Sequence, residues 1–374
     1  MNPHDPIERS IVVTQNGWSV SVLDQRQLPW RVERVELTSA AMAAQAIREM
    51  WVRGAPLIGA TAAYGLCLAL RDDPSDASLE RNLALLLATR PTAVNLRWAL
   101  ERLRASAQPH AGTARVAAAY RCASAICDED VRSNRAIGQH GLDLIRCAVQ
   151  PGMTVNVLTH CNAGALATVD LGTALAPIYR AHELGIPVHV WVDETRPRNQ
   201  GALLTAYELN RAGVAHTVIT DNAGGFLMQR GDVDLCLVGA DCVARNGDVC
   251  NKIGTYLKAL AARDNEVPFY VAFPFSTFDG SLASGRDITI EERNPDEVAS
   301  IRGQTSVGEL ATVMLTRSRA ANPAFDITPA RLVTAWVTER GVIREMADLN
   351  LRSGEAARDP GTNGPHPERE ISSA

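Results

Sequence analysis

Cys161 follows a short apolar run typical of a buried strand and directly precedes a stretch predicted to be helical. It lies in the string Thr-His-Cys-Asn-Ala-Gly at residues 159–164, after the apolar run at 154–158. A thiol close to the N-terminus of a helix has its thiolate form stabilised by the helix dipole and by free amide groups. Cys161 is therefore a candidate functional thiol, and the alternative is a small buried apolar side chain.

Asp241 occupies the same kind of position after a second apolar run, Leu-Cys-Leu-Val-Gly-Ala at 235–240. A carboxyl at the mouth of a buried strand is partly desolvated, which raises its pKa toward the range of a general acid. The alternative is a helix cap or turn former, because the turn signal Asn-Gly-Asp follows at 246–248.

Arg53 and Arg90 are candidate ligands for an anion. Arg53 precedes Gly54, Ala55 and Pro56, and a helix is predicted to begin at the proline. Free N–H groups at a helix start beside a guanidinium suit a phosphate dianion. Arg90 precedes another predicted helix and offers a second guanidinium. A solvated arginine is the alternative at both positions.

Asn251 and Lys252 open a further predicted helix. A lysine at a helix start opposes the dipole, which indicates an anionic or hydroxyl-bearing ligand unless the side chain is simply solvated. The sequence holds no Gly-rich nucleotide-binding loop, no nucleophile elbow and no cluster of residues at metal-ligand spacing. His160 stands alone among strand residues, which is more typical of a packed histidine than of a ligand. We therefore expect neither a metal nor a cofactor.

Three regions of different pattern must position these residues. Residues 1–150 begin with period-two runs that predict a small antiparallel sheet, and continue with helical runs. These helical runs lie at 39–52, 56–70, 77–88, 93–105 and 132–149. Residues 353–374 are rich in Gly, Pro, Glu, Arg and Ser, and predict a disordered tail.

The middle region, residues 151–352, alternates short β-rich runs with longer helical ones. The strands are predicted at 154–158, 188–192, 217–220, 235–238 and 269–272, and the helices at 166–184, 201–212, 224–230 and 253–263. Such alternation predicts an α/β fold, a doubly wound parallel sheet covered on both faces. Ligands of these sheets bind beyond the carboxyl ends of the strands, where Cys161 and Asp241 lie.

Composition excludes several other classes of protein. The chain of 374 residues has a formal net charge of −5, which argues against a nucleic-acid partner. No uncharged apolar run reaches the roughly 18 residues of a membrane span, and the first ten residues lack an apolar signal-peptide core. Eight cysteines without a Cys-x-x-Cys pair are typical of mostly buried thiols in a reducing cytoplasm. We therefore expect a cytoplasmic protein that binds neither nucleic acid nor membrane.

Several strings taken together resemble the methylthioribose-1-phosphate isomerase family, over residues 23–345. Besides the strings around Cys161 and Asp241, they are Leu-Asp-Gln-Arg-Gln-Leu-Pro at 23–29, Arg-Gly-Ala-Pro-Leu-Ile-Gly at 53–59, Arg-Pro-Thr-Ala-Val-Asn-Leu at 90–96, Asp-Glu-Thr-Arg-Pro-Arg at 193–198 and Asn-Lys-Ile-Gly-Thr at 251–255. The wider superfamily includes ribose-1,5-bisphosphate isomerases and regulatory subunits of a translation-initiation exchange factor. One departure is Cys242, which stands where the family usually has Arg.

The resemblance implies a homodimer with a Rossmann-like domain and an aldose–ketose isomerase acting on 5-methylthioribose 1-phosphate in methionine salvage. It implies Cys161 and Asp241 as catalytic residues, with neither a metal nor a redox cofactor. The substrate-contacting positions of that family correspond to Arg53, Gly54, Ala55, Arg90, Gln200, Asn251 and Lys252 in this sequence. The alternatives are an isomerase of 5-deoxyribose 1-phosphate or ribose 1,5-bisphosphate, and a regulatory subunit without catalysis.

An apolar wall is expected around the methylthio group of such a substrate. Phe273, Phe275 and Met228 are candidates for part of this wall. The alternative is that each of them belongs to the hydrophobic core.

Overall fold

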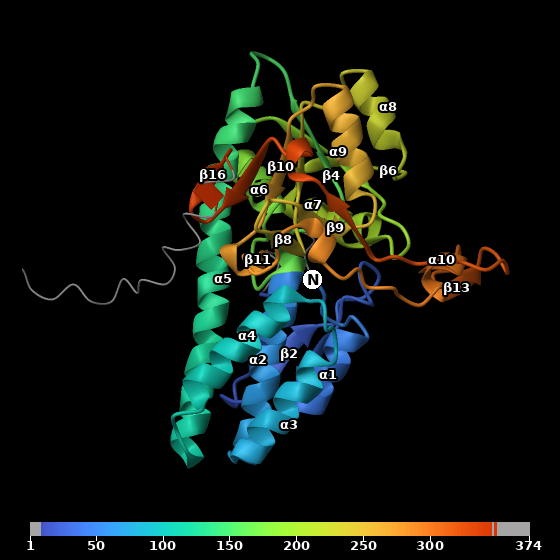
Figure 1. Ribbon diagram of the computed structural model, residues 1–374. Helices are drawn as coiled ribbons and strands as arrows, with labels where there is room; N and C mark the ends of the chain where they lie inside the picture. The colour runs from blue at the N-terminus through green and yellow to red at the C-terminus, as the bar shows by residue number, and fades with distance from the viewer. Residues whose placement is uncertain (1–8, 346–347, 350–374) are drawn as a thin grey trace, which may run out of the picture.

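The helical and the sheet-rich parts of the chain lie one above the other and share one long helix, α5 (Gly112–Ala148) (Figure 1). The computed structural model describes residues 9–345 and 348–349. The predicted disordered tail at 353–374 lies outside the described residues.

The N-terminal part begins with the predicted antiparallel sheet of β1 (Ile11–Val13), β2 (Val20–Leu23) and β3 (Arg34–Leu37). Four helices follow, α1 (Ala40–Arg48), α2 (Ala55–Asp72), α3 (Asp76–Leu87) and α4 (Val94–Ala107). Ser39 Oγ caps α1 by accepting a hydrogen bond from Met42 N, and Pro56 lies in the first turn of α2, where a backbone N–H is not needed. Because α2 is buried along most of its length, it forms the centre of this helical core.

Helix α5 has 37 residues, far more than the 132–149 predicted from the sequence. Its earlier residues, up to Val131, pack in the core of the helical part, whereas those from Ile137 onward pack against the large sheet. Helix α5 thus passes from the core of the helical part to the core of the large sheet within its own length. A domain boundary at residue 150 remains a proposal. Although α5 is long, no helix of the described residues has both the length and the apolar character needed to cross a membrane.

Seven strands form the large sheet in the order β16-β15-β10-β7-β4-β5-β6. Their bounds are β4 (Val155–Thr159), β5 (Val188–Asp193), β6 (Ala215–Ile219), β7 (Leu235–Val238), β10 (Phe269–Ala272), β15 (Ala335–Thr338) and β16 (Gly341–Ile343). All neighbours pair in parallel except β15 and β16. The five predicted strands are β4, β5, β6, β7 and β10, each displaced by no more than two residues at either end.

Helices cover both faces of this sheet, as the predicted doubly wound fold requires. Along β7, Leu235 and Leu237 share one core cluster with α6 (Leu175–Glu183) and α7 (Ala206–Ala212). Cys236 and Val238 share the opposite cluster with α8 (Ala223–Gln229) and α9 (Thr255–Asp264). This alternation of apolar side chains explains why β7 reads as one continuous apolar run in the sequence.

The strand order reverses between β4 and β7. From β4 the chain adds β5 and β6 on one side, and it then returns to add β7, β10 and β15 on the other. In doubly wound sheets the ligand-binding crevice lies at this reversal, beyond the carboxyl ends of the two strands. Cys161 follows β4 and Asp241 follows β7, so the fold brings both to that crevice.

A second, smaller sheet was not predicted from the sequence. It consists of β11 (Phe278–Asp279), β8 (Cys242–Ala244), β9 (Val249–Lys252) and β14 (Phe325–Thr328). Strand β9 carries Asn251 and Lys252, so Lys252 ends a strand, and the predicted helix begins only at Thr255. After α10 (Asp296–Ala299), a hairpin of β12 (Ser300–Gln304) and β13 (Leu310–Met314) projects from the body of the molecule (Figure 1).

The helix predicted at 166–184 is wrong over its first half. A 3₁₀ turn spans Ala165–Ala167, and α6 begins only at Leu175. Between them, Leu171 and Gly172 adopt left-handed backbone conformations, and Gly172 bridges back to Gly164. Left-handed residues end a helix, so the segment after Cys161 is a folded loop.

Candidate active site

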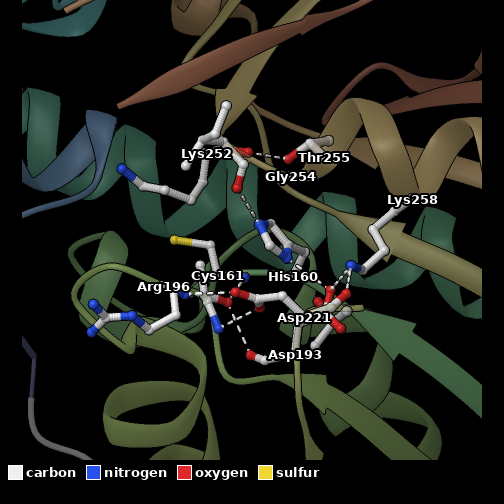
Figure 2. Close-up of polar contacts among 12 residues, drawn as sticks. His160, Cys161, Asp193, Arg196, Asp221, Lys252, Gly254, Thr255 and Lys258 are labelled. Atoms are coloured by element: carbon white, nitrogen blue, oxygen red, sulfur yellow. Dashed lines mark hydrogen bonds and ion pairs between the residues drawn. The ribbon is translucent and has the colours of Figure 1, made fainter. Parts of the chain in front are cut away.

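Hydrogen bonds between the Cys161 backbone and two threonine side chains hold this residue in a left-handed conformation, with φ 66°. Cys161 N donates to Thr195 Oγ1 at 2.8 Å, and Thr205 Oγ1 donates to the Cys161 carbonyl at 2.7 Å. A left-handed conformation costs conformational free energy for a residue other than glycine, so the hydrogen bonds to the two threonines have to hold Cys161 in it. Figure 2 shows the sulfur on the same side as the Lys252 side chain.

The Cys161 thiol is buried. Burial raises its pKa, against the opposing charges of Arg53 and Lys252. The thiol donates a hydrogen bond from Sγ to Gln200 Oε1 at 3.5 Å, and Arg53 Nη2 lies 3.8 Å from Sγ. The thiolate-stabilising helix predicted after Cys161 is replaced by a 3₁₀ turn, so nearby cations are what favour the thiolate here.

Asp241 lies directly beyond β7, half-buried, with its backbone N–H donating to the Cys250 carbonyl at 2.9 Å. Burial raises the pKa of the Asp241 carboxyl, although the charges of Lys252, Arg90 and Arg53 act in the opposite direction. Among the residues that the structure describes, none donates a hydrogen bond to this carboxylate. The Asp241 carboxyl is therefore available to a ligand.

Lys252 and Asn251 are both buried at the end of β9. Lys252 Nζ donates to the Ala324 carbonyl at 2.9 Å and lies 4.6 Å from the centre of the Phe325 ring. Burial lowers the pKa of Lys252, while Cys161 and Asp241 act to raise it. Asn251 Nδ2 donates to Thr255 Oγ1 at 3.1 Å. The ammonium group thus supplies positive charge to both predicted catalytic residues.

Arg53 comes from the helical part and reaches the loop that carries Cys161. Its Nη2 donates to the Asn162 carbonyl at 2.8 Å and its Nη1 donates to Asn162 Oδ1. Its Nε is buried and has no hydrogen-bond partner among the described residues. Gly54 has φ 91°, and a Cβ there would lie 2.3 Å from the Ala167 carbonyl oxygen, so only glycine fits between α2 and this loop.

Arg90 is held by an ion pair that joins the two parts of the chain. Arg90 Nη2 lies 2.6 Å from Glu291 Oε2. Further ion pairs extend this one into a chain of alternating charges. Glu291 also pairs with Arg293 at 2.9 Å, and Arg293 pairs with Glu297 at 2.8 Å. The chain ends with Arg198, which lies 2.9 Å from Glu297. Glu291 therefore competes for Arg90 with any anion that enters the site.

Two cavities meet the predicted site residues. The smaller, of about 30 Å³, is lined by Arg53, Gly54, Ala55, Cys161, Asp241 and Asn251 together with loop residues around them. The larger cavity, of about 330 Å³, is lined by Gln200 and also by Arg53, which therefore borders both cavities. Lys252 and Arg90 line neither cavity and act on Asp241 through their charge. Because about 30 Å³ holds roughly two water molecules, the smaller cavity must widen to admit a sugar phosphate.

Glu208 is a site-forming residue that the sequence analysis missed. It is fully buried and accepts hydrogen bonds from Asn162 Nδ2 at 2.7 Å, Ala165 N at 2.7 Å and Tyr179 Oη at 3.0 Å. These bonds shape the loop that follows Cys161. The one available signal was an acidic residue that follows the mostly apolar stretch at 202–207.

The predicted wall residues lie elsewhere. Phe273 and Met228 are buried in the core between the large sheet and α8 and α9, as is Phe275, and none of them lines either cavity. The apolar lining of the larger cavity comes instead from Leu28, Met50, Leu203 and Leu204. These residues come from loops and from the short π-helical turn Gly201–Thr205, whose packing the sequence pattern does not reveal.

Comparison with known proteins first identifies the protein family to which this fold and this site belong. The initiation factor 2 subunit family matches residues 51–345. A solved structure described as translation initiation factor eIF-2B, subunit delta, from A. fulgidus has a TM-score of 0.75 and 38% identity, covering 93% of this chain and 99% of that one.

Named relatives narrow the class. A methylthioribose-1-phosphate isomerase of Acidiphilium cryptum is 62% identical over 89% of this chain and 92% of its own length, and one of Methylorubrum populi is 58% identical over 96% and 97%. The crystal structure of 5-methylthioribose 1-phosphate isomerase from Pyrococcus horikoshii OT3 has a TM-score of 0.81 at 37% identity, covering 95% of this chain and 98% of that one. The chain belongs to the initiation factor 2 subunit family and, within it, to the methylthioribose-1-phosphate isomerases.

Proposed function

We propose that the protein is an aldose–ketose isomerase of methionine salvage that converts 5-methylthio-D-ribose 1-phosphate to 5-methylthio-D-ribulose 1-phosphate. The observation that carries the proposal is that a buried thiol and a carboxyl with a raised pKa line one cavity at the strand-order reversal. The high identity to named isomerases over nearly the whole chain supports the same reaction. The two groups also argue against a regulatory subunit without catalysis, and a turnover assay with the purified protein tests this directly.

Asp241 supplies the acid–base chemistry in this proposal. The phosphate on carbon 1 locks the sugar as a cyclic glycosyl phosphate, so the ring has to open before hydrogen moves from carbon 2 to carbon 1. The Asp241 carboxyl protonates the ring oxygen, and its carboxylate then takes a proton from the carbon 2 hydroxyl. The raised pKa keeps the acid form available for the first step.

Cys161 lies where it can act in either of two routes for the hydrogen transfer. As a thiolate it removes the carbon 2 hydrogen as a proton, and the resulting enediol is then protonated at carbon 1 by the thiol or by solvent. As a neutral thiol it forms part of a dry wall for a direct hydride shift from carbon 2 to carbon 1. Burial raises the pKa of the Cys161 thiol, which favours the neutral wall.

We therefore expect deuterium placed at carbon 2 of the substrate to be retained at carbon 1 of the product, because a hydride shift never releases it to solvent. Mass spectrometry of the product after complete turnover in ordinary water measures this retention. Washout of the label would assign the enediol route and make Cys161 the base.

The phosphate is expected to bind between the start of α2 and the Arg53 guanidinium. Gly54 and Ala55, at the start of α2 where N–H groups have no partner within a helix, line the cavity, and Arg53 Nε has no hydrogen-bond partner among the described residues. Arg90 contributes a second guanidinium once the phosphate competes with Glu291. Gln200, Asn251 and Lys252 complete the proposed substrate contacts.

Arg53→Ala should weaken substrate binding by about 2–3 kcal/mol, the scale for losing a charge-assisted hydrogen bond. Isothermal titration calorimetry with the substrate in the Cys161→Ser background measures this loss while turnover is slowed. Arg31→Ala is the matched control, because Arg31 is exposed and its ion pair among the described residues is a long one, to Glu33 at 3.9 Å. A loss no larger than that of the control would remove Arg53 from the phosphate site.

The substituent at sugar carbon 5 is proposed to enter the larger cavity. Leu28, Met50, Leu203 and Leu204 give it apolar walls. Four arginines line it: Arg198 lies 2.9 Å from Glu297, Arg26 lies 2.8 Å from Asp24, and Arg53 reaches the Asn162 carbonyl. The fourth, Arg302, donates to the Arg26 carbonyl and to Gln27 Oε1. A methylthio group therefore fits this cavity better than a second phosphate.

Ribose 1,5-bisphosphate should consequently be a far poorer substrate than 5-methylthioribose 1-phosphate. The 5-deoxy sugar should lie within roughly 10–200-fold of the methylthio sugar, the usual effect of a small apolar change. Values of kcat/KM for the three substrates measure these differences. If the bisphosphate were the best substrate, the proposed carbon 5 specificity would be wrong while the isomerase chemistry would stand.

The proposal places this reaction in the cytoplasm and in a homodimer. Its support is the resemblance of the chain to the isomerase family and the reduced state of its eight cysteines, all of which are free and seven of which are buried. Sedimentation of the purified protein measures the assembly.

A further inference from the structure

His160 makes hydrogen bonds to an acceptor from each of its ring nitrogens. Nδ1 lies 2.8 Å from Asp193 Oδ2, and Nε2 lies 2.8 Å from the Ile253 carbonyl oxygen (Figure 2). A carboxylate and a carbonyl both accept, so both nitrogens have to donate for both bonds to form. A neutral ring donates from only one nitrogen, and the other would face an acceptor lone pair.

The chain is shaped to admit this ring. Gly254 has φ 102°, and a Cβ there would lie 3.0 Å from the Cε1 atom of His160. Gly254 N donates to Asp326 Oδ2 at 2.7 Å, which fixes the turn that presents the Ile253 carbonyl. Because the ring is only 1% exposed, water does not replace either bond.

Several charged groups surround the ring. Lys258 is buried and its Nζ lies 3.1 Å from the same Asp193 oxygen. Burial raises the pKa of Asp326, and the charge of His160 is among those that act to lower it. The carboxylates nearby are Asp193, Asp221 and Asp326, and the cations other than His160 are Lys252 and Lys258.

A metal ion is the competing explanation for this cluster. His160, Asp193 and Asp221 offer ligand atoms that lie within 4.8 Å of one another. Lys258 already pairs with Asp193 and donates to the Asp221 carbonyl, and the Asp221 carboxylate accepts two backbone N–H groups at 2.7 and 2.8 Å. Protein donors thus already occupy Asp193 Oδ2 and both carboxylate oxygens of Asp221, while Asp193 Oδ1 is buried and has no hydrogen-bond partner among the described residues.

We propose that His160 is a positioning residue for the isomerisation, an imidazolium that ties the Cys161 loop to the end of β5 and to the Lys252 strand. His160 directly precedes Cys161, its carboxylate partner ends β5, and its carbonyl partner directly follows Lys252. One ring therefore sets the thiol and the ammonium group relative to each other. The inference rests on the proposed isomerase function.

The protonation state has a direct test in the wild-type protein. In a sample labelled with ¹⁵N-histidine, both ring nitrogens of His160 are expected to show one-bond coupling to a proton near neutral pH. The His160→Gln spectrum assigns the signals, because they alone disappear. A single ring N–H would overturn the imidazolium, and this readout does not depend on any enzymatic activity.

The positioning role is tested by two variants that each keep one donor. His160→Asn keeps a donor near the Nδ1 position, and His160→Gln keeps one near the Nε2 position. We expect kcat per folded protein to fall about 100-fold in both, with KM changed less than about 3-fold, because the reacting groups are displaced. His189→Gln is the control that should leave kcat unchanged, since His189 is half-buried on β5 and contacts Thr217.

An isotope effect separates positioning from simple loss of structure. With carbon 2 deuterated substrate, the effect on kcat should rise in both variants, because the chemical step becomes the slow one. An isotope effect equal to that of the wild type in both variants, or a wild-type kcat, would overturn the positioning role. Absence of isomerase activity in the wild-type protein would instead refute the proposed function, and the NMR result would still decide the state of the ring.

Discussion

Asp241→Asn should lower kcat by about 10²–10⁴-fold, the range for loss of a general acid–base group, while substrate affinity stays close to that of the wild type. Asparagine preserves the shape of the side chain but neither donates nor accepts the proton that opens the ring and moves between oxygens. Single-turnover kinetics and calorimetric binding on the purified variant measure the two quantities separately. Near-normal turnover would remove Asp241 from the mechanism.

Stability distinguishes this catalytic role from a structural one. The folded protein raises the pKa of Asp241, so the proton is bound more tightly in the folded than in the unfolded state. This group therefore contributes stability at low pH that is lost as the pH rises through its raised pKa. Asp241→Asn should accordingly have a Tm near neutral pH equal to or above that of the wild type. Asp264→Asn, at the exposed end of α9, is the matched control for both turnover and Tm.

Cys161→Ser should lower kcat by about 100-fold or more, whichever route moves the hydrogen. A serine hydroxyl is far less acidic than a thiol, and it is more strongly solvated, so it replaces neither a thiolate base nor a dry wall. The change in volume is small, and the hydrogen bonds of the Cys161 backbone to Thr195 and Thr205 are preserved. Turnover of the purified variant measures the loss.

Cys147→Ser is the control for this experiment, because Cys147 is the exposed cysteine near the end of α5. It should retain wild-type kcat. Alkylation gives a second measurement: a wild-type protein modified at Cys161, located by peptide mass spectrometry, should be inactive. Full activity of that modified protein would contradict the role given to the thiol.

Much of the large sheet follows from local sequence, because its central strands are buried on both faces. Strands β7 and β10 read as continuous apolar runs and β4 and β5 as short β-rich runs, and the residues after β4 and β7 meet at the strand-order reversal. The smaller sheet escaped prediction because its strands are short and pair over long separations. Strand β14, for example, pairs with β9 through Phe325 and Lys252.

The partners of the site residues were harder to predict than the residues themselves. Arg90 stands out as a basic residue before a helix, but Glu291, its partner, lies 201 positions further along the chain. His160 was interpreted as a packed histidine, and only its two acceptors, Asp193 and the Ile253 carbonyl, reveal its hydrogen-bonding state. Chemical type is visible in a sequence, whereas the pairing of charges is set by tertiary contacts.

The central claim is the isomerisation itself, and nuclear magnetic resonance of the reacting sugar tests it most directly. Purified protein is incubated with 5-methylthioribose 1-phosphate, and ¹³C and ³¹P spectra are recorded with time. The account requires a ketone carbon to appear at position 2 while the phosphate stays esterified to carbon 1. Release of inorganic phosphate, or an unchanged substrate with folded protein, would contradict it.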